Sequence, residues 1–218
     1  MGLKVIITGV TGMVGEGVLI ESLRNESVDS VLVVTRKPLG LDHPKLKELV
    51  VSDFLELEAK PELRGFDACF YCAGISSNGM SEELYTRITY ETTLHFANVV
   101  SELNPKIIFN FISGASTDGS EKGKAMWARV KGKTENALRR MFPGRQYSFR
   151  PALMKPFPEQ RHLYGYNKWI VRLYPVMSLV FPACTIQEIA RAMIQTTRHG
   201  YKETVLEVQD IKAQAGQS

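Results

Sequence analysis

The sequence predicts a doubly wound α/β fold, in which helices cover both faces of a parallel sheet. Short runs rich in Val, Ile and Phe alternate with helical stretches along residues 1–150. These runs are almost continuously apolar, which is typical of strands that are buried on both faces of a sheet. A glycine-rich turn at residues 8–15 joins the first apolar run to the first helical stretch. Strand, glycine turn and helix in this order are typical of folds that bind dinucleotides.

The elements follow one another in a regular order, with right-handed crossovers expected between parallel strands. The apolar runs predict strands at residues 3–7, 30–35, 49–51, 68–71, 106–112 and 147–150. Apolar spacing of three and four residues predicts helices that begin near residue 14 and that span 81–103 and 123–141.

From Pro151 onward the pattern changes, because five prolines divide the chain into shorter pieces. We expect a loop at 154–160, followed by helices at 161–180 and 185–199. A last strand at 204–208 and a frayed tail at 213–218 are expected after them.

The helix at 185–199 has clear end signals. Thr185 is a suitable N-cap with Glu188 three residues later, and Gly200 stands where a helix often ends. We expect a single domain over residues 1–218, in which 152–200 forms a small extension on the substrate side.

The charge balance limits the classes of partner. The chain has 27 Lys and Arg against 23 Asp and Glu, and these are scattered without a basic stripe, so no nucleic-acid partner is expected. No apolar run approaches the roughly 20 residues of a membrane span, and no signal peptide precedes the first strand, so we expect a cytoplasmic protein without a membrane partner.

The three cysteines are too few for a disulfide framework. Cys69 and Cys72 lie in one predicted strand, where residues three apart point to opposite faces. Cys184 has no cysteine or histidine beside it that would complete a metal site. We expect buried structural thiols and no metal.

The glycine turn has the spacing G-x-x-G-x-x-G. Gly9 permits a tight turn, Gly12 lets backbone N–H groups approach a pyrophosphate, and Gly15 lets the helix pack on the strand. The helix amino end favours a bound anion. The alternative is a simple turn with two packing glycines. We predict that Thr11, Met13 and Val14 of this turn also contact the cofactor.

The end of the second strand indicates which dinucleotide binds. Sites for NAD usually have Asp or Glu there, whereas this chain has Arg36 followed by Lys37. Because an arginine can pair with a 2′-phosphate, we expect NADP rather than NAD.

Two other strand ends bear on the same site. Asp53, followed by Phe54, either accepts a hydrogen bond from the adenine amino group or caps a short helix at 54–60. At the end of the fourth strand, the small residues of Cys72-Ala73-Gly74 would leave room for a cofactor ribose.

These residues together resemble the short-chain dehydrogenase/reductase superfamily, in its atypical and extended NAD(P)-binding branches. The similarity includes a serine-bearing strand end at residues 113–116 and an Arg-Pro pair at 150–151. Residues 130–135 look most like the Tat-interacting-protein-like oxidoreductases, which are often labelled epimerase-like. The resemblance implies catalytic roles for Ser113 and Lys131, cofactor contacts for Lys131 and Pro151, and a homodimer that pairs through the helices at 81–103 and 123–141.

The chain departs from the superfamily at one catalytic position. The motif Tyr-x-x-x-Lys matches at Lys131, but Trp127 occupies the tyrosine position. An indole N–H donates a hydrogen bond and does not act as an acid near neutral pH. Three alternatives follow: another residue such as Tyr164 or Tyr166 supplies the proton, the substrate needs none, or the domain binds its cofactor without turnover.

The sequence therefore predicts an NADP-dependent oxidoreductase that acts on a small carbonyl-type substrate. The first alternative is a non-catalytic NADP(H)-binding sensor or scaffold. A nucleotide-sugar epimerase is the weaker alternative, because the segment after Arg150 is short for a lobe that holds the sugar nucleotide.

Overall fold

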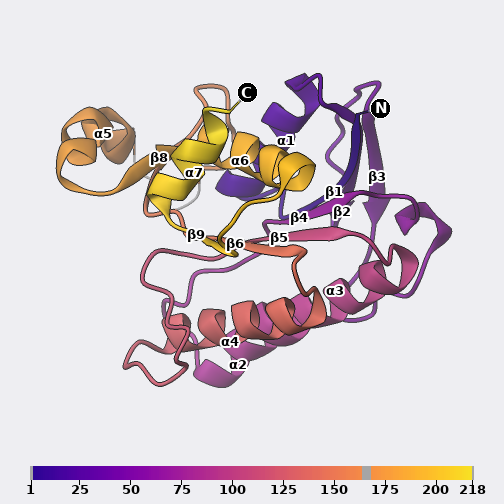
Figure 1. The fold of residues 1–218 in the computed structure, drawn as a ribbon, viewed down its shortest axis with the longest axis horizontal. Helices are drawn as coiled ribbons and strands as arrows, with labels where there is room; N and C mark the ends of the chain where they lie inside the picture. The colour runs from indigo at the N-terminus through magenta and orange to yellow at the C-terminus, as the bar shows by residue number, and fades with distance from the viewer. Residues whose placement is uncertain (1, 164–167, 218) are drawn as a thin grey trace.

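The computed structural model describes residues 2–163 and 168–217, which form a seven-stranded sheet with helices on both faces (Figure 1). The strand order is β3-β2-β1-β4-β5-β6-β9, and every neighbouring pair is parallel. The order reverses between β1 and β4, so the predicted doubly wound, Rossmann-like fold is confirmed. The strands are β1 (Leu3–Thr8), β2 (Val28–Thr35), β3 (Leu46–Val50), β4 (Ala68–Tyr71), β5 (Ile108–Ile112), β6 (Gln146–Phe149) and β9 (Val205–Leu206).

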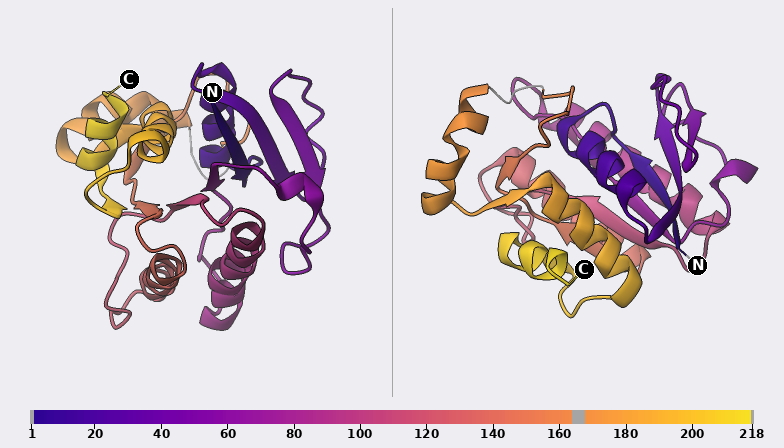
Figure 2. Two further views of the ribbon diagram at one scale, coloured as in Figure 1. Left: turned by 45° about the vertical axis from the view of Figure 1, so that its right-hand side comes forward. Right: turned by 90° about the horizontal axis from the view of Figure 1, so that it is seen from above.

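The helices form one layer on each side of the sheet (Figures 1 and 2). One layer contains α1 (Met13–Arg24), α6 (Ile186–His199) and α7 (Val208–Ala215). The other contains α2 (Glu82–Thr86), the π-helical turn η2 (Arg87–Glu91), α3 (Thr92–Leu103) and α4 (Met126–Met141).

Successive strand residues supply two separate hydrophobic clusters. Ile7 and Phe70 belong to the cluster beneath α1 and α6, whereas Ile6 and Cys69 belong to the cluster that α3 and α4 cover. This alternation with a period of two is what a sheet covered on both faces requires. Cys69 and Cys184 are buried as predicted, whereas Cys72 is only partly buried. Cys69 and Cys72 pack in opposite clusters, and all three cysteines are free.

Three helices differ from their predicted boundaries. The one predicted at 161–180 is not helical at 161–163 and, within the described residues, covers Lys168–Val180. The helix predicted at 81–103 is present but contains the π-helical turn η2. The helix predicted to begin at 123 begins at Met126, because the Arg129 guanidinium takes the carbonyl oxygens of Gly123 and Lys124 and the Gly123 N–H donates to Asp118 Oδ2.

The short helix at 54–60 does not form, so that alternative for Asp53 is wrong. Asp53 Oδ1 instead accepts the Leu55 N–H at 2.9 Å and closes a turn. Phe54 and Leu57 point into the α3 cluster from irregular backbone, and the Leu57 carbonyl is 2.9 Å from His95 Nε2. A single 3₁₀ turn, η1 (Pro61–Leu63), follows.

The segment after Pro151 contains a second, two-stranded parallel sheet. It consists of β7 (Leu153–Lys155) and β8 (Ala183–Thr185), which α5 (Lys168–Val180) connects. The predicted capping box of α6 is present, since Thr185 Oγ1 accepts the Glu188 N–H and the Glu188 carboxylate accepts the Thr185 N–H.

The tail predicted to be frayed at 213–218 is helical as far as Ala215. In α7, Val208, Ile211 and Ala215 are buried at helical spacing against α6, and Asp210 Oδ2 accepts the Glu207 N–H at its start. Over residues 2–163 and 168–217, no helix has the length and apolar composition that crossing a bilayer requires.

Candidate functional site

A cleft of about 820 Å³ opens at the carboxyl ends of β1, β2 and β4, where the strand order reverses. Open α/β sheets bind their ligands at this position. Ten residues that the sequence assigned to the cofactor line the cleft: Gly9, Thr11, Gly12, Met13, Arg36, Asp53, Phe54, Cys72, Ala73 and Gly74. Four other predicted site residues lie outside this lining: Val14, Ser113, Lys131 and Pro151.

The first glycine of the turn touches the chain that follows β4. Gly9 has a φ of +72°, and a Cβ atom at this position would lie 2.5 Å from backbone atoms of Cys72 and Ala73. The Ala73 N–H also donates to Thr8 Oγ1 at 3.2 Å. Only glycine combines this backbone conformation with this close approach. The two strand ends are therefore held side by side at the floor of the cleft.

The amino end of α1 faces the same cleft. Gly12 is its N-cap and makes no side-chain capping hydrogen bond, so no side chain of the described residues occupies the first N–H groups of the helix. Gly15 packs directly on the Gly9 carbonyl, which fixes the helix against the turn. Unpaired N–H groups and the positive end of the helix dipole suit a pyrophosphate.

The charged groups that line the cleft are Arg36, Arg87 and Asp53. Arg36 is exposed at the end of β2, where the sequence placed it. Asp53 is exposed and uses Oδ1 in its own turn. Two guanidinium groups against one carboxylate make this end of the cleft suitable for an anionic group.

One wall of the cleft was not predicted from the sequence. Leu84, Arg87, Ile88 and Thr92 reach it from the helix that contains η2. Positions 84, 88 and 92 share one helical face, so the spacing was visible in the sequence. Nothing in the sequence indicated that this face lies opposite the glycine turn.

Lys131 is on α4, and its side chain reaches the end of β5, the neighbour of β4 in the sheet. Its Nζ donates to the Ile112 carbonyl at 3.3 Å and lies 5.7 Å from the centre of the Phe111 ring. Burial lowers the pKa of Lys131 to about 8, and the nearby Glu135 carboxylate opposes part of this shift. The side chain is thus held beside the cleft rather than in solvent.

The lowered pKa of Lys131 predicts a dependence of stability on pH. The unfolded chain holds this proton up to a pKa of about 10.4, so between about pH 8 and pH 10 it binds more protons than the folded chain. The free energy of unfolding should therefore rise with pH in this range, by up to about 3 kcal/mol, relative to Lys131→Met. Below pH 8 the Lys131 amine is protonated in both the folded and the unfolded chain. The cost of burying its charge then lowers the free energy of unfolding by a constant amount. Urea unfolding of the wild-type protein and of Lys131→Met at pH 7, 8, 9 and 10 measures this dependence. A difference in the free energy of unfolding that does not change with pH contradicts the prediction.

The hydroxyl group of Ser113 is engaged within the protein. Thr117 Oγ1 donates its one hydrogen to the Gly114 carbonyl at 2.8 Å. In its 3.0 Å contact with Ser113 Oγ, Thr117 therefore accepts and Ser113 donates. To polarise a substrate carbonyl, as the sequence predicts, the Ser113 hydroxyl must turn away from Thr117.

Trp127 lies in the first turn of α4, one helical turn before Lys131, and is half-buried. Its ring borders Gly114, where an added Cβ would lie 3.8 Å from Trp127 Cζ3. The indole therefore stands beside the end of β5, next to Ser113. This corner contains a hydrogen-bond donor where the superfamily motif has a tyrosine.

Arg150 is part of a buried ion pair and does not enter the cleft. Its guanidinium contacts the fully buried Glu135 carboxylate at 2.6 and 3.0 Å, and it also pairs with Glu207 at 3.2 Å. These carboxylates raise the pKa of Arg150. Pro151 is buried, and its carbonyl accepts the Ala115 N–H. The Arg-Pro pair thus connects β6 to α4 and to the loop after β5.

The loop before α5 contacts the first turn of α1. The Glu16 carboxylate accepts the N–H groups of Arg161 and His162 and lies 3.3 Å from His162 Nδ1. His162 therefore packs against α1, and its side chain is 31% exposed. Tyr164 and Tyr166, the alternative proton donors, lie outside the described residues.

Comparison with known proteins identifies the family. The model of the NAD dependent epimerase/dehydratase family matches residues 5–147, about two thirds of the chain. The chain belongs to this family. Leucinostatins biosynthesis cluster protein T of Purpureocillium lilacinum is 28% identical over 141 residues, which are 62% of this chain and 51% of that protein. The chain thus spans about half the length of this relative.

Solved structures with the same fold include epimerases and a reductase. The Helicobacter pylori ADP-L-glycero-D-manno-heptose-6-epimerase has a TM-score of 0.69 at 14% identity, covering 99% of this chain and 82% of the epimerase. The Bacillus cereus UDP-glucuronic acid 4-epimerase, in complex with NAD, has a TM-score of 0.67 at 16% identity, covering 94% and 76%. A Saccharomyces cerevisiae short-chain dehydrogenase/reductase has a TM-score of 0.62 at 13% identity, covering 99% of both chains. These likenesses confirm the fold of the predicted superfamily.

The region that matches the NAD dependent epimerase/dehydratase family contains the whole lining of the cleft, together with Ser113, Trp127 and Lys131. Arg150, β7, α5 and α6 follow it. Within the described residues, no three His, Cys, Asp or Glu side chains are arranged to hold a metal ion.

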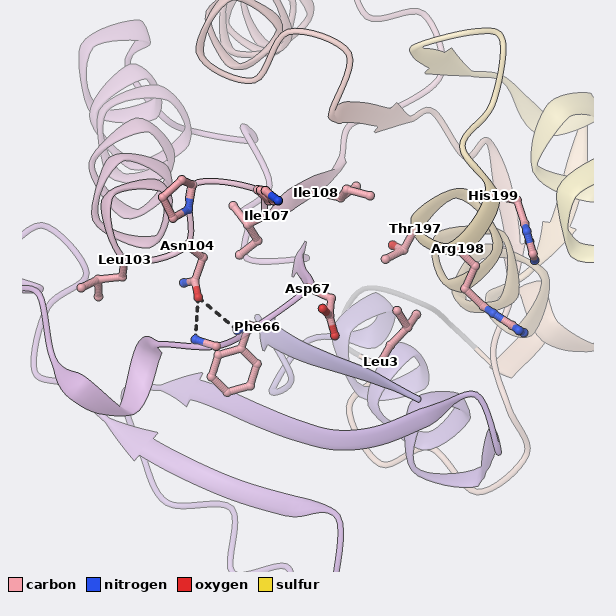
Figure 3. Close-up of a pocket in the computed structure, with 13 residues that line it drawn as sticks. Leu3, Phe66, Asp67, Leu103, Asn104, Ile107, Ile108, Thr197, Arg198 and His199 are labelled. Atoms are coloured by element: carbon pink, nitrogen blue, oxygen red, sulfur yellow. Dashed lines mark hydrogen bonds between the residues drawn. The ribbon is translucent and has the colours of Figure 1, made fainter. Parts of the chain in front are cut away.

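A second hollow, of about 740 Å³, lies at the opposite, amino-terminal edge of the sheet (Figure 3). Its polar groups are largely satisfied within the protein. Asn104 Oδ1 accepts the N–H groups of Gly65 and Phe66, Asp67 Oδ2 accepts the Lys4 N–H, and Arg198 donates to Ser27 Oγ. This hollow is therefore not continuous with the candidate site and offers few unpaired groups to a ligand.

Proposed function

We propose that the chain binds NADP(H) in the cleft between β1 and β4 and is an oxidoreductase that acts on a small carbonyl-type substrate. The observation that carries the proposal is the uncapped amino end of α1, which faces the cleft beside Gly9. The family to which the chain belongs and the NAD complex of the Bacillus cereus epimerase support a nicotinamide cofactor.

The cleft residues fit the parts of such a cofactor. The N–H groups after Gly12 would hold the pyrophosphate, and the apolar wall of Phe54, Leu84 and Ile88 would contact the adenine. Lys131 would reach the nicotinamide ribose from the end of β5. When bound, the cofactor supplies the hydride chemistry, and the protein orients it and the substrate.

Arg36 is proposed to select NADP over NAD through the 2′-phosphate. Arg36→Asp should weaken NADPH binding about 10- to 100-fold, because a charge-assisted contact is replaced by repulsion. NADH binding should change less than threefold. Fluorescence titration of both cofactors measures this, with Lys37→Asp as the control, since it makes the same charge change at an exposed position outside the cleft lining. Equal losses for NADPH and NADH would refute the role of Arg36.

The oxidoreductase activity is tested by NADPH consumption with a panel of aldehydes and quinones. Consumption should occur with members of the panel and be lost in Lys131→Ala. It should persist in Lys133→Ala, which removes an exposed lysine of the same helix. An absence of turnover across the panel, or equal rates in both variants, contradicts the proposal.

A non-catalytic sensor or scaffold is the second candidate, and Trp127 with the engaged Ser113 hydroxyl favours it. It predicts tight NADPH binding without consumption of any substrate. Family membership favours a third candidate, a nucleotide-sugar epimerase. That candidate predicts interconversion of a sugar nucleotide without net consumption of cofactor, which product analysis by chromatography would detect.

A further inference from the structure

A patch of apolar side chains is exposed on α5 and on the residue that follows it. Five of the nine exposed large apolar side chains of the described residues lie within 173–181, and their exposed fractions range from 50% to 85%. Proteins in solution usually expose such side chains singly, so a cluster marks an interaction surface. We call this cluster the α5 patch; it consists of Leu173, Val176, Leu179, Val180 and Phe181.

The helix that carries the patch stands away from the main sheet (Figures 1 and 2). It connects β7 to β8, and its principal contact with the rest of the described chain is with β7. Leu173, Val176 and Val180 are three and four residues apart and therefore share one helical face. The patch is thus an outward face of a helix that lies outside both helical layers.

The stretch of sequence that contains the patch carries positive charge alone. Residues 160–187 contain no Asp or Glu, although they include Arg161, Lys168 and Arg172. Lys155, exposed on β7, places its Nζ 5.8 Å from the centre of the Tyr174 ring of α5.

The acidic residues that bound this stretch are both engaged elsewhere. Glu159 pairs with Arg24 at 2.7 Å, and Glu188 accepts the Thr185 N–H in the capping box. The stretch 160–187 therefore has no carboxylate of its own, and the two that flank it in sequence already have partners.

A second copy of the chain is a poor match for this surface. A twofold contact through α5 would bring together two copies of a stretch that has basic residues and no carboxylate, with Lys155 of each copy beside Tyr174 of α5. An anionic surface with an apolar interior has the complementary character. Apolar side chains can enter it while Lys and Arg meet its charged groups.

We propose that the α5 patch docks on the surface of an anionic lipid bilayer, with α5 lying in the plane of the interface. A 13-residue helix is about 20 Å long, and aromatic residues such as Tyr174 and Phe181 suit the boundary between headgroups and acyl chains. The sequence predicts no membrane partner because no run is long enough to span one. The length of an apolar run says nothing about a helix that lies on the membrane surface. The exposure of α5 can be seen only in the folded structure.

The experiment is flotation of the full chain with vesicles of phosphatidylcholine alone and with vesicles that also contain phosphatidylserine. Binding should require phosphatidylserine and should weaken as salt is raised from 0.1 to 0.5 M. Leu179→Asp should reduce binding at least tenfold, since a buried leucine contributes more than the 1.4 kcal/mol that corresponds to this factor. Lys155→Glu should also reduce it. Leu41→Asp, the same change at an exposed leucine far from α5 in sequence, should bind like the wild type.

Three results would overturn the proposal. The first is an absence of binding to the phosphatidylserine vesicles. The second is equal losses in Leu179→Asp and Leu41→Asp, which would place binding elsewhere. The third is dimerisation, measured by light scattering, that Leu179→Asp abolishes while no vesicle binding occurs; a second copy would then cover the patch. Unchanged thermal unfolding of the variants shows that the fold is retained.

Discussion

Replacing Gly9 with alanine should abolish cofactor binding and lower the free energy of unfolding by about 3 kcal/mol or more. The φ of +72° is strained for alanine, and its Cβ would lie 2.5 Å from the backbone after β4, which cannot move without shifting the sheet. The substitution therefore disturbs the contact that shapes the cleft. Urea unfolding and NADPH titration measure the two effects.

Gly40→Ala is the matched control for this prediction. Gly40 has a φ of +65°, but an added Cβ would meet nothing within 4 Å. Its substitution should cost only the backbone strain, about 1 kcal/mol, and leave NADPH affinity unchanged. If the two variants lose equal stability and both bind NADPH, the close approach at Gly9 has no functional consequence.

Replacing Trp127 with tyrosine should raise kcat/KM for NADPH-dependent carbonyl reduction by about 10²- to 10⁴-fold. The change restores Tyr-x-x-x-Lys on α4, so a phenol would lie one helical turn from the Lys131 ammonium group. That positive charge favours the phenolate, and tyrosine can then exchange a proton with the substrate oxygen. Initial rates with the aldehyde or quinone that the wild type reduces best give the comparison.

Trp127→Phe distinguishes proton transfer from a gain of space. It also removes the indole but supplies no hydroxyl, so it should leave the rate within a few-fold of the wild type. NADPH affinity should stay similar in all three proteins. A gain that is equal for tyrosine and phenylalanine, or the absence of a gain, would mean that position 127 does not deliver a proton here.

The main elements of the fold could be predicted because local patterns determine them. The buried strands are apolar throughout, and Thr185 with Glu188 indicates the start of α6. The predicted elements are wrong where side chains compete for backbone hydrogen-bonding groups or where packing overrides the composition of a segment. Arg129 takes carbonyl oxygens that α4 would otherwise use, Asp53 closes a turn, and burial of Ile211 orders a polar tail.

The candidate site could be predicted where it depends on the glycine turn and on strand ends. Gly9, Arg36 and Cys72 all lie on the cleft, as their positions after parallel strands require. The wall that contains Arg87 could not be predicted, because it depends on how a helix crosses the sheet. The engagement of the Ser113 hydroxyl by Thr117 depends on the path of the loop after β5 and leaves no pattern in the sequence.

The proposed function depends on binding of NADP(H) in the cleft between β1 and β4. Isothermal titration calorimetry of the wild-type protein with NADPH and with NADH tests it most directly. We expect one site per chain and NADPH binding at least about tenfold tighter than NADH binding. Tighter binding of NADH would contradict the role of Arg36, and the absence of binding by either cofactor at millimolar concentration would contradict the assignment of the cleft itself.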